Sequence, residues 1–177
     1  MKSKKLFLNE PFIDNLEKKY LKNVIDKKWL SINGEYTKKF EYKISKYLNR
    51  KYVIAVQSGT AAIHASLKAL DVKKNDNVIL PNYTCVSNLS VVHQLGAKPI
   101  IVEVEKETLG LDFDNLVRAV NKYKPKVVQI VHVYGFPARD TIKIINFCKK
   151  KKIKVLEDMS ESLGSEIGKK KNWRIWR

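Results

Sequence analysis

Lys126-Val-Val-Gln-Ile-Val-His-Val133 and Ile153-Lys-Val-Leu156 are two short runs rich in Val and Ile, and the residues between them, 138–151, have the apolar spacing of a helix. A strand, a helix and a second strand in this order form two parallel strands joined by a crossover. Such crossovers are right-handed in nearly all known sheets. This stretch therefore predicts an α/β fold.

The same alternation runs from residue 52 onward. Three further strands are expected at Tyr52–Val56, Asn77–Leu80 and Pro99–Val104, and three further helices near 60–70, 84–95 and 112–123. Because strands alternate with helices along the whole stretch, the sheet should be mainly parallel. We predict one α/β domain over residues 51–168.

The first 50 residues have a different sequence pattern. Residues 12–30 and 35–48 place apolar side chains at helical spacing among lysines, with a break at Leu30-Ser-Ile-Asn-Gly34. No Pro- or Gly-rich linker separates this region from the α/β domain. We therefore predict that residues 1–50 form an N-terminal helical arm.

Length and composition narrow the class of protein. The chain has 177 residues, of which 44% are hydrophobic, and this is enough for one sizeable core. Cys85 and Cys148 lack the spacing of a metal site and suit a reducing compartment better than a disulfide framework. The N-terminus has no secretory apolar core, and no apolar run approaches membrane-spanning length. We expect a soluble cytoplasmic protein with no metal site and no membrane partner.

The net charge of +17 raises the question of nucleic-acid binding. Of the 35 Lys and Arg residues only five are Arg, which is the residue best suited to forked contacts with phosphates and bases. The lysines are spread along the chain rather than gathered in one segment. A basic nucleic-acid binder is therefore the weakest functional alternative, and we expect no nucleic-acid partner.

Polar residues follow four of the predicted strands. They are Gln57–Thr60, Pro81–Thr84, His132–Pro137 and the pair Glu157-Asp158. In open parallel sheets, ligands bind beyond the carboxyl ends of the strands. We expect these residues to lie at one edge of the sheet, which is the candidate site.

The segment Val56-Gln-Ser-Gly-Thr-Ala-Ala62 joins a predicted strand to a predicted helix. Gly59 allows close approach of the backbone, and the free N–H groups of a helix start bind phosphate well. Alternatively, Ser58 or Thr60 merely caps the helix, and the local sequence favours neither reading. The segment is neither a Walker lysine loop nor a three-glycine dinucleotide fingerprint.

Asp158 ends the last predicted strand. A carboxylate at this place can face a cationic ring nitrogen, and in pyridoxal phosphate the protonated nitrogen turns the ring into an electron sink. The alternative is structural, because Asp158-Met-Ser-Glu161 also fits a reciprocal helix-capping pattern. Taken alone, the local sequence favours the cap.

Two histidines are weaker candidates for the site. His93 lies in a predicted helix among apolar residues, which indicates a core or surface position rather than a ligand. His132 ends a strand before Tyr134-Gly135 and could line the site. For His132 we nevertheless expect a packing role.

Taken together, six segments resemble the DegT/DnrJ/StrS-type nucleotide-sugar aminotransferases, which depend on pyridoxal phosphate and share the aspartate-aminotransferase fold (fold type I). The resemblance runs from about residue 9 to residue 168. Its segments are Trp29-Leu-Ser-Ile-Asn-Gly34, Ser58-Gly-Thr-Ala-Ala62, Pro81-Asn-Tyr-Thr84, Gly96-Ala-Lys-Pro99, Val131-His-Val-Tyr-Gly135 and Glu157-Asp158 with Gly164 beyond. Each segment is modest, and their order and spacing make the resemblance specific.

The resemblance implies roles for five residues. Gly59 and Thr60 would hold the cofactor phosphate, and Asp158 would pair with the pyridine nitrogen. Glu161 would lie near the ring hydroxyl. A Glu at this position resembles the enzymes that make perosamine-type sugars. Cys85 stands where relatives usually stack an aromatic ring on the cofactor, and a polarizable sulfur can still pack there.

The resemblance also implies partners. Its members transfer an amino group, here expected from glutamate, to a nucleotide-linked keto sugar, and they work as homodimers. They continue with a Gly-x-x-Gly-Asp segment, a further strand and the lysine that forms the Schiff base. No lysine follows Lys171, so no residue matches the catalytic one. We expect an incomplete cofactor-binding large domain that is inactive as it stands.

Three readings of the function follow. The first is a truncated aminotransferase of this type. The second is a non-catalytic remnant, or the frameshifted product of such a gene. The third is a plain nucleotide-binding α/β module, which rests only on the strand–Gly–helix segment at residues 56–62.

We predict that residues 169–177 are an out-of-frame tail. Tryptophan has the single codon TGG, so a shift of one nucleotide forward turns each Trp of Trp173-Arg-Ile-Trp-Arg177 into a glycine codon. The result is Gly-x-x-Gly-x at the place where the family has Gly-x-x-Gly-Asp. Lys169–Lys171 offers a run of adenines for slippage. Sequencing the coding DNA should reveal the family's next strand and lysine in the forward frame; a forward frame without them would refute the frameshift.

Overall fold

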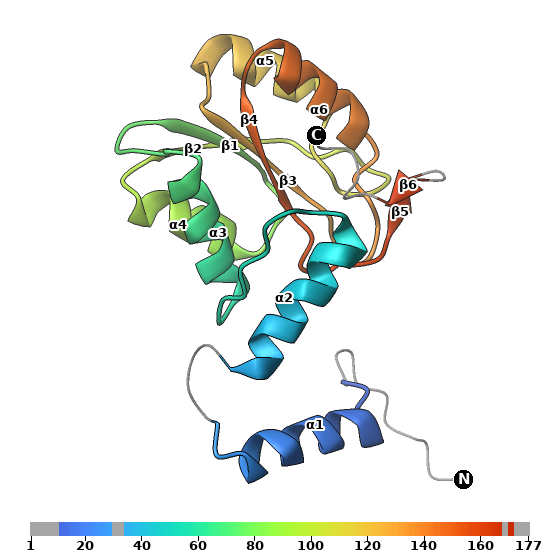
Figure 1. Ribbon diagram of the computed structural model, residues 1–177. Helices are drawn as coiled ribbons and strands as arrows, with labels where there is room; N and C mark the ends of the chain where they lie inside the picture. Colours follow the sequence, from blue (N-terminus) through green and yellow to red (C-terminus); the bar gives the residue numbers. More distant parts are fainter. Residues whose placement is uncertain (1–10, 30–33, 168–169, 172–177) are drawn as a thin grey trace, which may run out of the picture. The chain divides into compact units, whose positions relative to one another are not determined.

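The chain folds into two compact units, Met1–Ala55 and Val56–Arg177, which are described separately (Figure 1). The computed structural model describes residues 11–29, 34–167 and 170–171. The predicted tail, residues 169–177, lies outside these residues except for Lys170–Lys171. Most of the break predicted at Leu30–Gly34 also lies outside them.

The first unit contains two helices, α1 (Asn15–Asp26) and α2 (Glu35–Leu48). Helix α2 has the predicted bounds, whereas α1 begins later than the predicted residue 12. Its start is fixed by a capping box, in which the Asp14 side chain accepts a hydrogen bond from Leu16 N and Glu17 Oε2 accepts one from Asp14 N at 2.9 Å. The cap therefore sets the first residue of α1.

The second unit is built on a four-stranded sheet. Its strands are β1 (Asn77–Pro81), β2 (Lys98–Val102), β3 (Val127–Val131) and β4 (Lys154–Asp158), in the order β2-β1-β3-β4. All three pairings are parallel. This confirms the α/β class and the mainly parallel sheet.

Helices cover both faces of this sheet (Figure 1). They are α3 (Gly59–Ala69) and α4 (Val86–Gln94) on one face, and α5 (Phe113–Tyr123) and α6 (Thr141–Lys150) on the other. Successive side chains of a strand point to opposite faces. Thus Val127 packs with α3 and α4, whereas Val128 packs with α5 and α6. Both side chains are fully buried.

One predicted strand is wrong. Residues 52–56 form no strand, and Tyr52 and Ile54 are 77% and 81% exposed. A strand is held by hydrogen bonds to a neighbour, and no segment among the described residues pairs with this one. The residues have strand propensity, but they lack the partner that would realise it.

The chain after β4 also differs from the prediction. Asp158 is followed by turns over residues 160–164, and not by a helix. Beyond them, β5 (Glu166–Ile167) pairs antiparallel with β6 (Lys170–Lys171). Along the sheet itself, β4 pairs with β3 and with no other strand in the described ranges. The sheet is therefore open at β4.

A buried carboxylate fixes the loop between β2 and α5. Glu105 is 5% exposed and accepts hydrogen bonds from the backbone N–H groups of Glu107 at 2.7 Å, and of Thr108 and Gly110 at 3.1 Å. Burial raises the pKa of Glu105, but the hydrogen bonds outweigh it and hold that pKa below its ordinary value. Thr108 Oγ1 in turn accepts from Arg139 N at 2.9 Å. The loop thus supports the segment that follows β3.

We predict that Glu105→Gln lowers the free energy of unfolding by about 1–3 kcal/mol at pH 7, because an amide cannot accept all of these hydrogen bonds. Since the folded-state pKa is lowered, this stabilisation is present above the unfolded-state pKa of about 4.3 and is lost as the pH falls through the folded-state pKa. Urea unfolding of both chains at pH 7 and at stepwise lower pH would measure the difference and its disappearance.

Glu107→Gln is the matched control for this prediction. Its side chain is 69% exposed, and its removal should change the free energy of unfolding by less than about 0.5 kcal/mol. Equal losses in the two variants would contradict the role given to Glu105.

Candidate functional site

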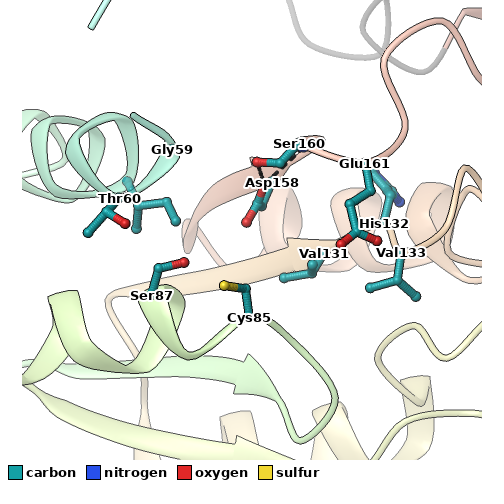
Figure 2. Close-up of a pocket in the computed structure, with 11 residues that line it drawn as sticks. Gly59, Thr60, Cys85, Ser87, Val131, His132, Val133, Asp158, Ser160 and Glu161 are labelled. Carbon is teal, nitrogen blue, oxygen red and sulfur yellow. Dashed lines mark hydrogen bonds between the residues drawn. The ribbon is translucent and has the colours of Figure 1, made fainter. Parts of the chain in front are cut away.

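A cavity of about 290 Å³ lies at the carboxyl edge of the sheet (Figure 2). It is bounded by the starts of α3 and α4, the ends of β3 and β4, and the turn after β4. Its lining includes all five residues singled out in the sequence: Gly59, Thr60, Cys85, Asp158 and Glu161. These residues are far apart in the sequence, and the parallel sheet brings them together.

The first turn of α3 forms one wall of the cavity. Ser58 caps the helix, since its Oγ accepts a hydrogen bond from Ala61 N at 3.1 Å. The backbone N–H groups of Gly59 and Thr60 have no acceptor within the helix. Helix capping and anion binding are therefore compatible at this helix start. Ser58 caps the N–H group of Ala61, and the N–H groups of Gly59 and Thr60 remain for an anion.

Gly59 also leaves room in the cavity. A Cβ at this position would have Ser160 Oγ as its nearest neighbour, 3.5 Å away. That distance is ordinary van der Waals contact, so no protein neighbour forces a glycine here. Its absent side chain instead leaves the space between α3 and Ser160 open to a ligand.

Asp158 forms the opposite wall and is held by three hydrogen bonds. Its Oδ1 accepts from Ser160 N at 3.1 Å and from Ser160 Oγ at 2.6 Å, and its Oδ2 accepts from Asn88 Nδ2 at 2.8 Å. The helix cap considered for Asp158 is wrong, because no helix follows it. The carboxylate caps a turn and faces the cavity (Figure 2).

Glu161 connects the turn after β4 to the loop after β3. Its Oε2 accepts a hydrogen bond from Tyr134 N at 2.8 Å. Tyr134 and Gly135 both have left-handed backbone, with φ of 54° and 81°, and the Ser165 hydroxyl donates to Gly135 O at 2.6 Å. Two residues of the later segment thus hold this loop in a conformation that non-glycine residues rarely adopt.

A pair of tyrosines connects the loop after β1 to the loop after β3. The hydroxyl oxygens of Tyr83 and Tyr134 are 2.6 Å apart, and their ring centroids are 6.2 Å apart. The hydrogen bond to Tyr83 raises the pKa of the Tyr134 phenol. The Tyr134 side chain therefore remains a neutral donor and acceptor at physiological pH.

His132 lines the cavity, as one reading of the sequence allowed, and it is also packed into the protein. It is 1% exposed, and its Nδ1 accepts a hydrogen bond from Ala138 N at 2.9 Å. That nitrogen carries no proton, so Nε2 donates to Glu157 Oε1 at 3.1 Å. His93 is exposed on α4. Over the described ranges, no group of three or more His, Cys, Asp and Glu side chains could hold a metal ion.

Asn88 lies behind the cavity wall, in contact with Asp158, and the sequence analysis missed it. It is fully buried in α4, and its Nδ2 donates to both Asp158 Oδ2 and Thr84 Oγ1. A signal was present, because Asn88 precedes Val91 and Val92 by three and four residues and so shares their core-facing side of the helix. A polar residue on an apolar face needs a partner.

The arrangement favours a ligand with two unlike ends. Free N–H groups and the positive end of the α3 dipole favour an anion, whereas the Asp158 carboxylate favours a cationic N–H donor. Cys85 lines the cavity as well. A phosphorylated pyridine ring with a protonated nitrogen has both ends, so the residues fit pyridoxal phosphate.

Comparisons with known proteins agree with this chemistry. The sequence profile of the DegT/DnrJ/EryC1/StrS aminotransferase family matches residues 11–172. The chain is 35% identical over 162 residues to GDP-perosamine synthase of Vibrio cholerae and covers 44% of that protein with 92% of its own length. It is 32% identical to GDP-perosamine synthase of Escherichia coli O157:H7, covering 43% of that protein with 89% of its own length.

Solved structures give the same result. A GDP-4-keto-6-deoxymannose-3-dehydratase with a trapped PLP-glutamate geminal diamine superposes with a TM-score of 0.86 at 28% identity, over 94% of this chain and 44% of that one. The E. coli GDP-4-keto-6-deoxy-D-mannose-3-dehydratase with bound hydrated PLP superposes with a TM-score of 0.84 at 29% identity, over 92% and 43%. The chain thus spans less than half the length of these relatives, and its sheet is incomplete relative to theirs. Within the described residues no helix is long and apolar enough to cross a membrane.

The two cysteines should differ in reactivity. Cys85 is exposed, and hydrogen bonding to the Ser87 hydroxyl and backbone lowers the pKa of its thiol. Cys148 is buried, and burial raises its pKa to about 12. In the folded chain, iodoacetamide should therefore alkylate Cys85 and spare Cys148, as mass spectrometry of the tryptic peptides would show.

Ser87→Ala tests the cause of this difference. Removing the hydroxyl should move the pH midpoint of Cys85 alkylation upward, because the thiolate loses a donor. Alkylation of the chain in denaturant, where both thiols react, is the control. A midpoint that Ser87→Ala leaves in place would show that Ser87 does not stabilise the thiolate.

Proposed function

Because the chain belongs to the DegT/DnrJ/EryC1/StrS aminotransferase family, we propose that its cavity binds pyridoxal phosphate, as the front part of an aminotransferase. The reaction of the complete protein is the transfer of an amino group, from glutamate, to a nucleotide-linked keto sugar. The observation that carries the proposal is the placement of Asp158 across one cavity from the free N–H groups of α3. GDP-perosamine synthases among the relatives support the sugar class.

Gly59 and Thr60 bind the phosphate of the cofactor in this proposal. Their N–H groups donate to phosphate oxygens, and the α3 dipole adds a favourable field. The Thr60 hydroxyl is a further donor at the same place. Ser58 keeps this helix start in shape by capping Ala61 N.

Asp158 binds the ring nitrogen and keeps a proton on it. With that proton in place, pyridoxal phosphate supplies an electron sink for the reaction. The carboxylate is suited to this task because Asn88 and Ser160 hold both of its oxygens. A carboxylate whose oxygens are fixed loses little orientational freedom when it binds a cation.

Glu161 and Cys85 contact the ring from its other sides. One Glu161 oxygen accepts from Tyr134 N, and Figure 2 shows the Glu161 carboxylate directed into the cavity, so the group can reach the ring hydroxyl. The Cys85 sulfur packs on the ring face, where relatives have an aromatic side chain. Both roles follow from the family resemblance and are compatible with the positions of the two residues.

The proposal assigns residues 51–168 to a partial cofactor-binding domain and residues 1–50 to a helical arm. Within these residues, Gly59, Thr60 and Asp158 hold the cofactor by non-covalent contacts. For the complete protein we propose a cytoplasmic homodimer. A non-catalytic remnant would share the cavity and differ only in lacking aminotransferase activity.

We predict that the 177-residue chain binds pyridoxamine phosphate, and that Asp158→Asn weakens this binding about ten- to a hundredfold. A hydrogen bond to a charged group contributes about 1.5–3 kcal/mol, and 1.4 kcal/mol is a factor of ten in Kd. Quenching of cofactor fluorescence on titration with protein would measure both constants.

Asp112→Asn is the matched control. Asp112 caps α5 away from the cavity, and Asn caps a helix equally well, so binding should not change. The nucleotide-binding alternative gives the opposite result, with a nucleotide bound more tightly than pyridoxamine phosphate and no dependence on Asp158.

A further inference from the structure

Asn88 makes an unusual set of contacts for a fully buried side chain. Its Nδ2 donates to Thr84 Oγ1 at 3.0 Å and to Asp158 Oδ2 at 2.8 Å, which uses both amide hydrogens. Its Oδ1 is buried and accepts no hydrogen bond from any described residue. Buried acceptors without a partner are rare in native proteins, so this one needs an explanation.

We propose that Asn88 is a positioning residue, which sets the direction in which Asp158 presents its free lone pair to the ring nitrogen of the cofactor. The inference rests on the proposed function. It adds a residue of α4 to a contact that the family resemblance assigns to Asp158 alone.

The orientation of the amide follows from the charge of its neighbour. An ionised carboxylate only accepts hydrogen bonds, so the NH₂ group of Asn88 must face Asp158. Turning the amide over would place its Oδ1 against the carboxylate oxygen and lose both donor contacts. The unpartnered Oδ1 is therefore the consequence of directing the NH₂ group at Asp158.

The hydrogen bonds leave Asp158 with one open acceptor direction. A carboxylate has about four lone-pair directions, and three hydrogen bonds from Asn88 and Ser160 occupy three of them. One direction remains for a ligand. That geometry suits a single N–H donor, as in a protonated pyridine ring, better than a group with several donors.

Asn88 and Ser160 contribute differently. Ser160 lies two residues after Asp158, at the start of the turn that follows β4. Asn88 belongs to α4, which is anchored by the buried side chains of Val91 and Val92. Of the donors that the described residues provide to Asp158, Asn88 alone therefore ties the carboxylate to a separate element of the fold.

The test compares two ligands that differ at one atom. The first is pyridoxamine phosphate, and the second is its analogue with C–H in place of the ring nitrogen. The ratio of their Kd values reports the nitrogen contact and cancels the phosphate contact, which both ligands share. It would be measured for the wild-type chain, Asp158→Asn, Asn88→Leu and Ser90→Ala.

Ser90→Ala is the matched control. Ser90 lies on the same helix, and its hydroxyl donates to Val86 O at 2.6 Å, away from Asp158. The wild-type chain should prefer pyridoxamine phosphate by about tenfold or more, and Asp158→Asn should abolish the preference. Asn88→Leu should reduce it by about three- to tenfold, whereas Ser90→Ala should retain it.

The outcomes separate the two proposals. If Asp158→Asn abolishes the preference and Asn88→Leu keeps it, Asn88 is merely structural and the inference is overturned. If the wild-type chain shows no preference, the contact between Asp158 and the ring nitrogen fails, and the proposed function fails with it.

A second measurement covers the case in which Asn88→Leu does not fold. In the wild-type chain, NMR should detect a scalar coupling across the hydrogen bond between Asn88 Nδ2 and Asp158 Cγ. The Asn88 side-chain amide resonances should shift on addition of pyridoxamine phosphate and stay in place with the analogue that lacks the ring nitrogen. Equal shifts with both ligands, or no coupling, would overturn the inference.

Discussion

The parallel pairing of β3 with β4 places Val131 opposite Asp158, and the whole cavity depends on this register. Side chains alternate between the two faces of a strand, so a slip by one residue would turn Asp158 toward α5 and α6. The register is held by apolar residues on both faces, such as Val128 and Val155 on one and Val127 and Leu156 on the other. The core thus determines which carboxyl group reaches the cavity.

The two faces of the sheet differ in how well their polar groups are satisfied. The face covered by α5 and α6 is a continuous apolar cluster. On the face covered by α3 and α4, Asn88 Oδ1 and both polar atoms of Gln129 are buried without a hydrogen-bond partner in the described chain. Each such atom costs about 1–3 kcal/mol. Both faces carry an apolar core, and the face covered by α3 and α4 gives up part of its stabilisation at these buried polar atoms.

The four strands of the sheet could be predicted from the sequence, because Val- and Ile-rich runs between helical patterns have few alternatives. The strand predicted at Tyr52–Val56 is wrong, because a strand needs a neighbour to pair with and the run itself does not provide one. The helix cap that was considered for Asp158 is also wrong, because no helix follows this residue. The residues Asp158–Glu161 match the sequence pattern of a helix cap. In the structure, however, the Ser160 hydroxyl donates to Asp158, and the Glu161 carboxylate accepts from Tyr134 N.

The sequence predicted where the site lies, but not all of the contacts between its residues. The residues after each strand were expected at one edge, and the structure brings five of them into one cavity. Asn88 was missed because it lies inside a helix rather than after a strand, and only the fold shows that it meets a residue 70 positions away.

The central claim is that this cavity holds a phosphorylated pyridine with Asp158 against its nitrogen. The most direct measurement is the ¹⁵N chemical shift of ring-labelled pyridoxamine phosphate bound to the chain, followed as a function of pH. The account predicts that the bound ring nitrogen stays protonated at pH values where the free compound has lost that proton. A bound nitrogen that titrates as it does in water would contradict it.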